Sequence, residues 1–483
     1  MKLTPIRILT LAAAAAGCQA SFALELPDQL GDHAVLQQQS DAKLWGWAKP
    51  GAEITASPSW SKKTVKTKAD ASGRWSLSVA TPAASYQPYS IKFTEGKESL
   101  TINDILIGEV WLAAGQSNME MPMRGFNSQP VEGAGADVAR SGALRDKVRM
   151  AYVVRGDKYE PQERIGGKWM VSSPENTAEF SAQGFYFARE LNELIDVPVG
   201  ILCVSYGGTQ IEGWLPRDIL ERYGYNPDAE PEIKELAPAY FYTTKYYSML
   251  YPLIGYTIKG FLWNQGESNI LNPDNYAQLL TEMVARWRSD WGDKDNSLSF
   301  YQTENPPFGW FNPGGLPAAL VREQQNKAVD MIPNSGITCT NDLVYPYETD
   351  VIHGTKKREI GERMAWQVAE RDYGVKGMTW RCPAYESHTI ADDGTARVRF
   401  KDTAFGLVPN CGNVEGFEVA GDDGVFHVAQ AKVDWNNPEV ILSCPEVKDI
   451  KNIRYCFKNF EIGGLRNSWG MPAIPFRTDE LKQ

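Results

Sequence analysis

The feature that most constrains the fold is the apolar run Ile105–Ala114, which ends at Gly115-Gln116-Ser117-Asn118. Such a run is typical of a strand that is buried on both faces, as in a parallel sheet covered by helices. Ser117 is therefore predicted just past the carboxyl end of a central strand, where open α/β sheets place their reactive groups. Gly115 permits a sharp turn there. A serine after a glycine is more often only a turn, so a catalytic interpretation depends on its partners.

A serine hydroxyl needs a neighbouring base to take its proton, and that base is most often histidine. Of the four histidines, His33 lies near the amino terminus, and His388 and His427 lie in a tail that is predicted to be all-β. Only His353 belongs to the α/β part, on a loop before a helix predicted from about residue 356 to 371. Asp350 precedes it by three residues, and its carboxylate is predicted to orient the imidazole. The alternative is that Asp350 caps the helix, but the shortage of other histidines favours a catalytic pair.

Two further strands are predicted to end at the same sheet edge with donors for an oxyanion. Val199–Ser205 is followed by the pair Gly207 and Gly208, which expose backbone N–H groups, and Ile258–Trp263 is followed by Gln265. Each of these ends alone is compatible with plain turn chemistry, but three strand ends with complementary chemistry favour a catalytic site. The predicted oxyanion donors are Ser117, Gly207, Gly208 and Gln265.

Four sequence blocks resemble the sialate O-acetylesterase family of the SGNH (GDSL-like) hydrolase superfamily. They are residues 115–120, 206–214, 263–269 and 350–363, within a match from about Leu26 to Asp479. The resemblance implies a three-layer α/β/α domain with a mostly parallel sheet, and a serine esterase that removes O-acetyl groups from carbohydrate through an acyl-enzyme. It also implies that Gln265 stands where other SGNH enzymes carry asparagine. Two positions depart from the family: Asn264 where an aromatic residue is expected, and Gly354 where proline is usual.

The acid and the nucleophile both have rivals in the sequence. Asp342, Glu348 and Glu267 compete with Asp350 for the acid, and Ser268 echoes the pattern around Ser117. No Gly-x-Ser-x-Gly elbow occurs at either serine, which disfavours the α/β-hydrolase form of the triad. No metal and no cofactor are predicted, because the histidines form no His-x-x-x-His pair and the cysteines lack the close pairing of zinc sites.

Contacts with a sugar are expected from aromatic and polar residues near these blocks. Trp214, at the end of the second block, and Trp310, in the loop 306–310, are candidates for lining a sugar site, although core packing is the commoner role of any one tryptophan. Arg124 is the candidate for steering a carboxylate or hydroxyl, and Glu267 is a further candidate substrate-binding residue.

The amino terminus predicts export. Lys2 and Arg7 precede a short apolar stretch, and Ser21-Phe22-Ala23 fits a signal-peptidase site that would release residues 1–23. A lipid anchor on Cys18 is a weaker alternative. The remaining chain has 47 basic and 60 acidic residues, a formal net charge of about −13, which disfavours nucleic acid as a partner. No later segment resembles a membrane span. One or two disulfides among the last four cysteines are left open, as is the oligomeric state.

The chain is predicted to have three parts after the signal peptide. Residues 24–103 alternate short strands with turns and predict a β-sandwich, residues 104–375 alternate strands with helices, and residues 376–483 predict a second β-domain. The clearest helix follows Asn272-Pro273, with an apolar face from Tyr276 to Trp287.

Two functions of different class are compatible with this organisation. The first is an esterase that acts on acetylated carbohydrate, with sialic acid and acetylated xylan or other hemicellulose as competing acetyl carriers. The second is a carbohydrate-binding protein whose α/β domain is catalytically idle. The full set of serine, histidine, acid and oxyanion donors favours the enzyme.

Overall fold

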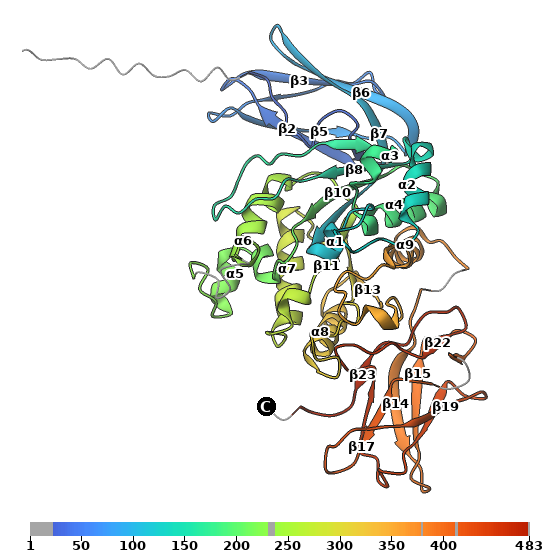
Figure 1. The fold of residues 1–483 in the computed structure, drawn as a ribbon. Coiled ribbons are helices and arrows are strands. Elements are labelled where there is room, and N and C mark those ends of the chain that lie inside the picture. The colour runs from blue at the N-terminus through green and yellow to red at the C-terminus, as the bar shows by residue number, and fades with distance from the viewer. Residues whose placement is uncertain (1–22, 230–236, 378–379, 411–413, 482–483) are drawn as a thin grey trace, which may run out of the picture.

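The computed structural model describes residues 23–229, 237–377, 380–410 and 414–481. A β-domain stands at each end of the molecule, with a mixed α/β part between them (Figure 1). The predicted signal peptide up to residue 22, with Cys18, and the cysteine at 411 lie outside the described residues. No helix in the described ranges is both long and apolar enough to cross a bilayer.

The middle part is built on a sheet in the order β13-β12-β11-β7-β10-β8-β9, in which all neighbours are parallel except β8 and β9. The buried strands expected at 105–114, 199–205 and 258–263 are all present, because largely apolar runs suit strands covered on both faces. Their bounds are β7 (Glu98–Gly115), β8 (Val148–Tyr152), β9 (Trp169–Val171), β10 (Val199–Ser205), β11 (Gly260–Asn264), β12 (Ser299–Thr303) and β13 (Ser335–Thr338).

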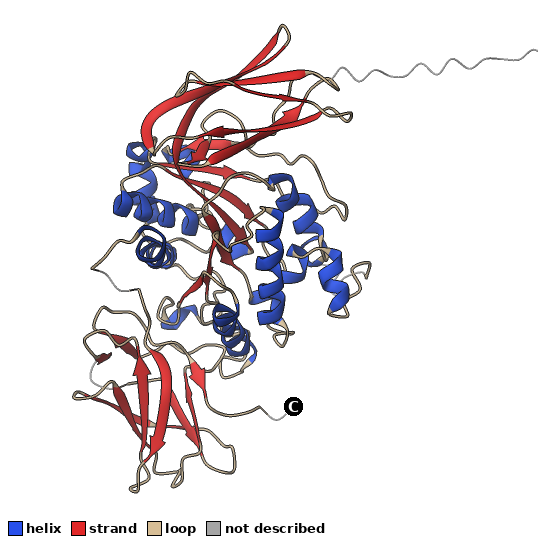
Figure 2. Cartoon of the chain, turned by 180° about the vertical axis from the view of Figure 1, so that it is seen from behind, coloured by secondary structure: helices blue, strands red, loops and turns tan. Residues whose placement is uncertain are grey.

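Helices cover both faces of this sheet (Figures 1 and 2). Alternate side chains of β7 point to opposite faces: Trp111 and Ala113 join the core formed with α4 and α9, whereas Leu112 and Ala114 join the core formed with α7 and α8. The predicted three-layer α/β/α fold is thereby confirmed. The helices are α1 (Ser117–Glu120), α2 (Ala134–Arg140), α3 (Pro174–Thr177), α4 (Ala182–Ile195), α5 (Arg217–Arg222), α6 (Ala237–Tyr240), α7 (Tyr276–Asp290), α8 (Pro317–Met331) and α9 (Lys357–Tyr373). Short helical turns occur at Ser141–Leu144, Ile211–Trp214, Tyr246–Leu250, Tyr251–Leu253, Glu267–Asn269 and Pro346–Glu348.

The amino-terminal β-domain is continuous with the central sheet, because β7 belongs to both. Its first half pairs with β6 in antiparallel fashion, and its second half pairs with β10 and β11. The expected boundary at residue 103 therefore falls inside one strand. The remaining strands are β1 (Val35–Gln37), β2 (Asp41–Trp47), β3 (Glu53–Pro58), β4 (Val65–Lys68), β5 (Arg74–Ala80) and β6 (Ser85–Glu95).

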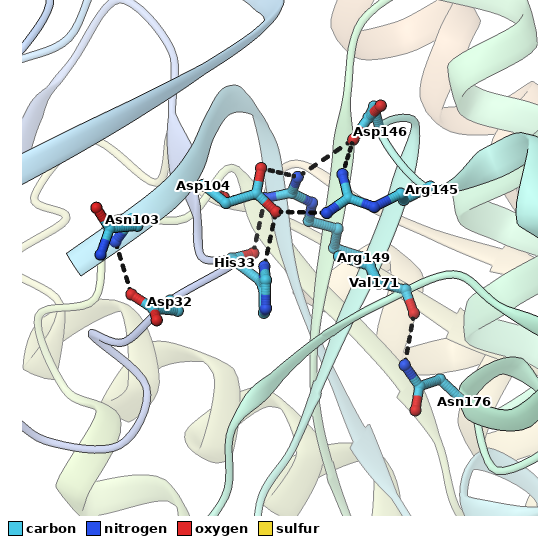
Figure 3. A network of polar contacts seen from close by, with 9 residues as sticks. All are labelled: Asp32, His33, Asn103, Asp104, Arg145, Asp146, Arg149, Val171 and Asn176. Atoms are coloured by element: carbon cyan, nitrogen blue, oxygen red, sulfur yellow. Dashed lines mark hydrogen bonds and ion pairs between the residues drawn. The ribbon is translucent and has the colours of Figure 1, made fainter.

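An ion-pair network braces this junction (Figure 3). The carboxylate of Asp104, in β7, lies 2.9 Å from the fully buried guanidinium of Arg149 in β8 and 2.7 Å from Nδ1 of His33. Arg145 adds a third contact at 3.2 Å. His33 thus pairs with Asp104, well before the end of β7 that leads to Ser117. This position agrees with the exclusion of His33 as a catalytic base.

The carboxy-terminal part is an all-β domain with its own core, as Figure 2 shows by its lack of helices. Two four-stranded sheets, β14-β15-β20-β19 and β18-β17-β21-β23, enclose this core beside the pair β16-β22. The bounds are β14 (Ala384–Ile390), β15 (Ala396–Lys401), β16 (Leu407–Pro409), β17 (Phe417–Ala420), β18 (His427–Val428), β19 (Gln430–Asp434), β20 (Glu439–Ser443), β21 (Asn452–Tyr455), β22 (Leu465–Asn467) and β23 (Phe476–Arg477). The cysteines of the described tail, Cys382, Cys444 and Cys456, are free thiols.

Candidate active site

Ser117 stands where three strand ends meet. In the sheet register, Gly115 at the end of β7 pairs with Ser205 at the end of β10 and with Asn264 at the end of β11. Gly115 has a φ of 138°, and a Cβ there would lie 2.1 Å from the Asn264 carbonyl oxygen, so only glycine fits. The chain turns sharply at this point and begins α1 with Ser117, which is half-buried. The predicted position of Ser117 just past a central strand is what the structure has.

The turn after β10 packs directly against Ser117. A Cβ on Gly207 would lie 3.4 Å from the Ser117 Cβ. The N–H of Gly207, however, donates to Oε2 of Glu120 at 2.8 Å, and Arg155 holds the other oxygen of that carboxylate at 2.5 Å. The structure therefore gives the Gly207 N–H an acceptor inside the protein, which differs from its expected role as an oxyanion donor.

Gln265 also lies at this edge, but its amide is used internally. Its side chain is fully buried, and Nε2 lies 2.7 Å from Oδ1 of Asn269, 3.0 Å from the Thr209 carbonyl and 3.1 Å from Oε1 of Gln116. Its Oε1 accepts from the Tyr276 hydroxyl at 2.8 Å. Gln265 thus ties the three strand-end loops together, and the structure shows no amide hydrogen left over for an oxyanion.

Two of the expected oxyanion donors remain available. Among the described residues, no acceptor is found for the backbone N–H of Ser117 or of Gly208. Gly208 has a φ of 78°, a left-handed conformation that glycine adopts without strain. The rival nucleophile Ser268 donates its hydroxyl to the Gly208 carbonyl at 2.9 Å, whereas the Ser117 hydroxyl has no partner in the described part of the chain.

The imidazole of His353 is held with one nitrogen free. Its Nδ1 contacts Oε1 of Gln129, and its ring packs edge-to-face with Phe126 at 5.0 Å between centroids. Because an amide oxygen only accepts, Nδ1 carries the proton and Nε2 keeps its lone pair. Nε2 is buried without a partner among the described residues. Burial, and then the charge of Lys357, lower the pKa of His353 to about 4, so the ring is neutral at pH 7. This is the tautomer that a general base needs.

The structure does not join Asp350 to His353. Asp350 is exposed, and Gln129 occupies the position at Nδ1 that its carboxylate was expected to fill. The rivals are engaged elsewhere: Asp342 forms a two-pronged ion pair with Arg363 at 2.7 and 2.8 Å, and Glu348 accepts from the backbone N–H groups of residues 345 and 355. Gln129 was missed by sequence reasoning, because a residue this distant in sequence gives no local signal.

A buried polar chain links α1, which begins at Ser117, to the loop that carries His353. Lys357 Nζ donates to Oδ1 of Asn118 at 2.5 Å, and Nδ2 of Asn118 donates to Glu267 at 2.5 Å and to the Ile352 carbonyl at 3.2 Å. Burial raises the pKa of Glu267 and lowers that of Lys357 to about 8. Glu267 therefore lies beneath the site as a support, so its prediction as a substrate-binding residue is corrected. The contacts of Asn118 account for the asparagine after Ser117, because its side-chain amide joins α1 to the loop that carries His353.

Residues 107–370 match the family described as carbohydrate esterase, sialic acid-specific acetylesterase, which is more than half of the chain. The chain belongs to this family. It is accordingly a carbohydrate O-acetylesterase, a carboxylic ester hydrolase, and the family prediction made from the four sequence blocks is confirmed.

Individual relatives agree with this assignment. The esterase is 31% identical to a solved carbohydrate acetylesterase from Xanthomonas citri, with a TM-score of 0.84 over 95% of this chain and 100% of that one. It is 25% identical to the sialate O-acetylesterase of Pongo abelii over 76% of this chain and 74% of the relative. The corresponding human protein is 24% identical over the same shares.

The three predicted sugar contacts of the esterase differ in their exposure and in their partners. Trp214 is fully buried, with ring centroids 5.6 Å from Trp263, and its Nε1 donates to Thr209, so its prediction as a sugar contact is corrected: it is a core residue. Arg124 is exposed but paired with Glu179 at 2.7 Å. Trp310 is partly exposed in the loop after β12 and remains a candidate.

Exposed apolar side chains gather at the same sheet edge. Leu271, Phe311 and Tyr347 are 84%, 94% and 76% exposed, the highest values of any large apolar side chain in the described part of 104–375. They stand on the loops that follow β11, β12 and β13 respectively. Carboxyl ends of parallel strands share one edge of a sheet, so these residues, here called the apolar rim, share the edge with Ser117.

Tyr347 stacks on a neighbouring aromatic ring in this rim. Its ring stacks on Tyr345 at 5.1 Å with an interplanar angle of 8°, and Lys356 lies 4.1 Å from the Tyr345 ring centroid. The Glu348 carboxylate accepts hydrogen bonds from the N–H groups of Tyr345 and Thr355, and so joins the two ends of the loop that carries His353. Tyr347 of the apolar rim and His353 therefore lie on the same loop.

Proposed function

We propose that this carbohydrate esterase is an exported serine enzyme that removes O-acetyl groups from sialic acid, with Ser117 as nucleophile, His353 as base and Asp350 as acid. The observation that carries the proposal is the pair of unpartnered groups: a serine hydroxyl at the meeting point of three strand ends and a histidine Nε2 on the adjoining loop, both without a partner among the described residues. The contact of Asn118 with Ile352 brings the two segments together.

In the proposed mechanism, Oγ of Ser117 attacks the acetyl carbonyl carbon while Nε2 of His353 takes the hydroxyl proton. The proton then passes to the sugar oxygen, the ester bond breaks, and the deacetylated sugar leaves an acetyl group on Ser117. Water attacks this acyl-enzyme, again losing a proton to His353. Acetate departs and Ser117 regains its proton, so the net reaction consumes one ester and one water.

The negative charge that develops on the carbonyl oxygen needs preorganised donors. The N–H groups of Ser117 and Gly208 are the donors that the described structure leaves without acceptors. Gly207 and Gln265 then act indirectly, because their hydrogen bonds to Glu120 and to the strand-end loops fix the backbone that carries these donors.

Asp350 is proposed as the acid because of the charge that forms on His353. A base with a pKa of about 4 is weak at neutral pH, and the neutral Gln129 amide stabilises no imidazolium. A carboxylate at Nδ1 would make the imidazole a stronger base and would also stabilise the imidazolium. Asp350 is three residues away on an exposed stretch of the same loop, and among the described residues it has no competing partner like those of Asp342 and Glu348. We propose that it replaces Gln129 when substrate is bound.

Recognition of the sialic acid carboxylate is assigned to Arg155. Its guanidinium is half-exposed, lies 4.6 Å from the Tyr206 ring centroid and reaches Glu120 in the nucleophile helix. Arg155 and Arg124 are both ion-paired, but the partner of Arg155, Glu120, belongs to the helix that begins at Ser117, whereas Arg124 pairs with Glu179 outside that helix. A second candidate, acetylated xylan or another hemicellulose, is favoured by the neutral apolar rim, because sugar rings stack on aromatic faces without needing a charge.

Acetate release from O-acetylated sialic acid and from acetylated xylo-oligosaccharide, measured side by side, tests the substrate. The proposal requires a higher kcat/KM for the sialic acid ester, and Arg155→Met should lower that value about tenfold or more while affecting the xylo-oligosaccharide less. A preference for the neutral ester that Arg155→Met leaves unchanged would establish the second candidate. Export is tested separately, by the amino-terminal sequence and cell fraction of the mature protein.

A further inference from the structure

The carboxy-terminal β-domain contains a pocket of about 360 Å³ that the esterase reaction does not use. It lies between the turn after β15, at residues 402–406, and the β19–β20 hairpin turn, with Ser468 at its side. This volume is within the range of pockets that hold small ligands. The domain that carries it lies apart from α1, where Ser117 sits (Figure 1).

Two aromatic side chains of this pocket are turned toward solvent. Phe405 is 91% exposed and Trp435 is 77% exposed, the highest values of any large apolar side chain in the described part of this domain. Neither belongs to the domain core. Side chains of this size normally stabilise a protein by burial, so two exposed ones at a single pocket mark a binding surface.

Both rings stand on turns that are braced by polar contacts. Asp434 accepts from the backbone of Asn436 at 2.9 Å and from Nδ2 of Asn437 at 3.0 Å. The N–H of Phe405 donates to Oγ of Ser468 at 3.0 Å. Such bracing reduces the conformational entropy that binding would otherwise cost.

The lining indicates a neutral ligand rich in hydroxyl groups. None of the residues that line the pocket is basic, and its one acid, Asp434, is paired with Arg397 at 3.3 Å. An anionic sugar or a nucleic acid finds no counter-charge there. Aromatic faces suit the C–H faces of sugar rings. Hydroxyl groups suit the Asn436 amide, and also the carbonyl oxygen and second amide hydrogen of Asn437, whose first hydrogen is donated to Asp434.

We propose that the pocket formed by Phe405, Trp435, Asn436 and Asn437 is a second, non-catalytic site that binds a neutral glycan chain. It holds the esterase on a polysaccharide while Ser117 acts elsewhere on the chain. The site depends only on the carbohydrate esterase identity, and it stands whichever sugar carries the acetyl group.

The test is affinity electrophoresis of the full-length Ser117→Ala protein through gels that contain deacetylated xylan, xyloglucan or polysialic acid. We expect retardation by a neutral polymer and none by polysialic acid. Trp435→Ala and Phe405→Ala, on separate turns, should each weaken binding roughly tenfold. Val428→Ala, which removes an apolar side chain that is 74% exposed outside the pocket, is the matched control and should bind as its parent does. Thermal melting confirms that each variant is folded.

Three outcomes overturn the proposal: no retardation by either neutral polymer, retardation that the folded Trp435→Ala and Phe405→Ala variants retain, or a dimer in sedimentation that Trp435→Ala dissolves without any polysaccharide binding. The last outcome assigns the surface to self-association. Hydrolysis of p-nitrophenyl acetate by the wild-type protein reports the serine mechanism independently, so failure of that mechanism and failure of the glycan site are distinguishable.

Discussion

The two halves of the active site are held in different ways. The half that carries Ser117 is fixed by sheet register, since Gly115, Ser205 and Asn264 are paired neighbours and Gln265 cross-links the loops that follow. The half that carries His353 is a loop whose position depends on side-chain contacts with Gln129, Glu348 and Asn118. Backbone pairing leaves one arrangement, whereas a loop held by side chains has neighbouring ones of similar energy. We therefore expect the serine half to be a rigid template and the histidine half to adjust on binding.

The largest effect is expected from Ser117→Ala, which removes the proposed nucleophile from the rigid half. Turnover should fall by on the order of 10⁶-fold, because the rest of the machinery acts as a unit with the serine. Steady-state release of acetate and a melting curve measure activity and fold together. Ser268→Ala is the matched control, since its hydroxyl is committed to the Gly208 carbonyl. Loss of turnover in Ser268→Ala, with Ser117→Ala still active, would identify Ser268 as the nucleophile instead.

The next effect probes the adjustable half. Asp350→Asn should lower kcat by up to about 10⁴-fold, because an amide cannot stabilise the imidazolium that forms during catalysis. Asp342→Asn and Glu348→Gln, at carboxylates with other partners, should affect kcat less. Gln129→Ala should also cost less, since the amide only orients the resting imidazole. If Asp350→Asn keeps near-normal turnover while Gln129→Ala collapses, the resting contact is the working one and Asp350 is not the acid.

Gln265 tests how far the rigid half is a scaffold. An oxyanion donor costs roughly 10²–10³-fold in kcat when removed, at unchanged stability. The contacts of Gln265 instead predict that Gln265→Ala leaves buried groups unsatisfied and lowers the free energy of unfolding by about 1–3 kcal/mol. Gln325→Ala is a matched buried control, because its amide donates to the Gln265 carbonyl. A large fall in kcat at wild-type melting temperature, absent in Gln325→Ala, would restore the donor role.

The difference between the Ser117 half and the His353 half also determines which features could be predicted from the sequence. Ser117, the three buried strands and the helix from Tyr276 follow from apolar periodicity and from glycine at a strand end, which are local signals. Gln129 and the stack of Tyr345 on Tyr347 arise from loops that meet only in the folded chain. The prediction of Trp214 as a sugar contact was wrong for a related reason: Trp214 ends one of the family sequence blocks, but its ring packs in the core beside Trp263 and Trp287. Proximity in sequence to a motif does not fix the direction of a side chain.

The smallest effect concerns pH, and it compares the free and substrate-bound forms of the adjustable half. His353 acts as a base only when neutral, so activity is lost as pH falls through its pKa and is retained above it. The profile of kcat/KM reports the free enzyme, and its acid limb should lie near pH 4, the lowered pKa that burial and Lys357 impose. The profile of kcat reports the bound enzyme, where pairing with Asp350 should raise the pKa and move the limb upward.

Lys357→Met tests the cause of that low value. Removing a positive charge beside His353 favours the imidazolium, so the acid limb of kcat/KM should move upward. The shift should stop short of the ordinary value of 6.5, because burial is the larger cause and remains. Lys356→Met, in the neighbouring stack on Tyr345, is the control and should leave the limb in place. A limb that stays near pH 4 in Lys357→Met would leave burial as the sole cause, and a wild-type limb above pH 6 would show that the carboxylate already pairs with His353 in the free enzyme.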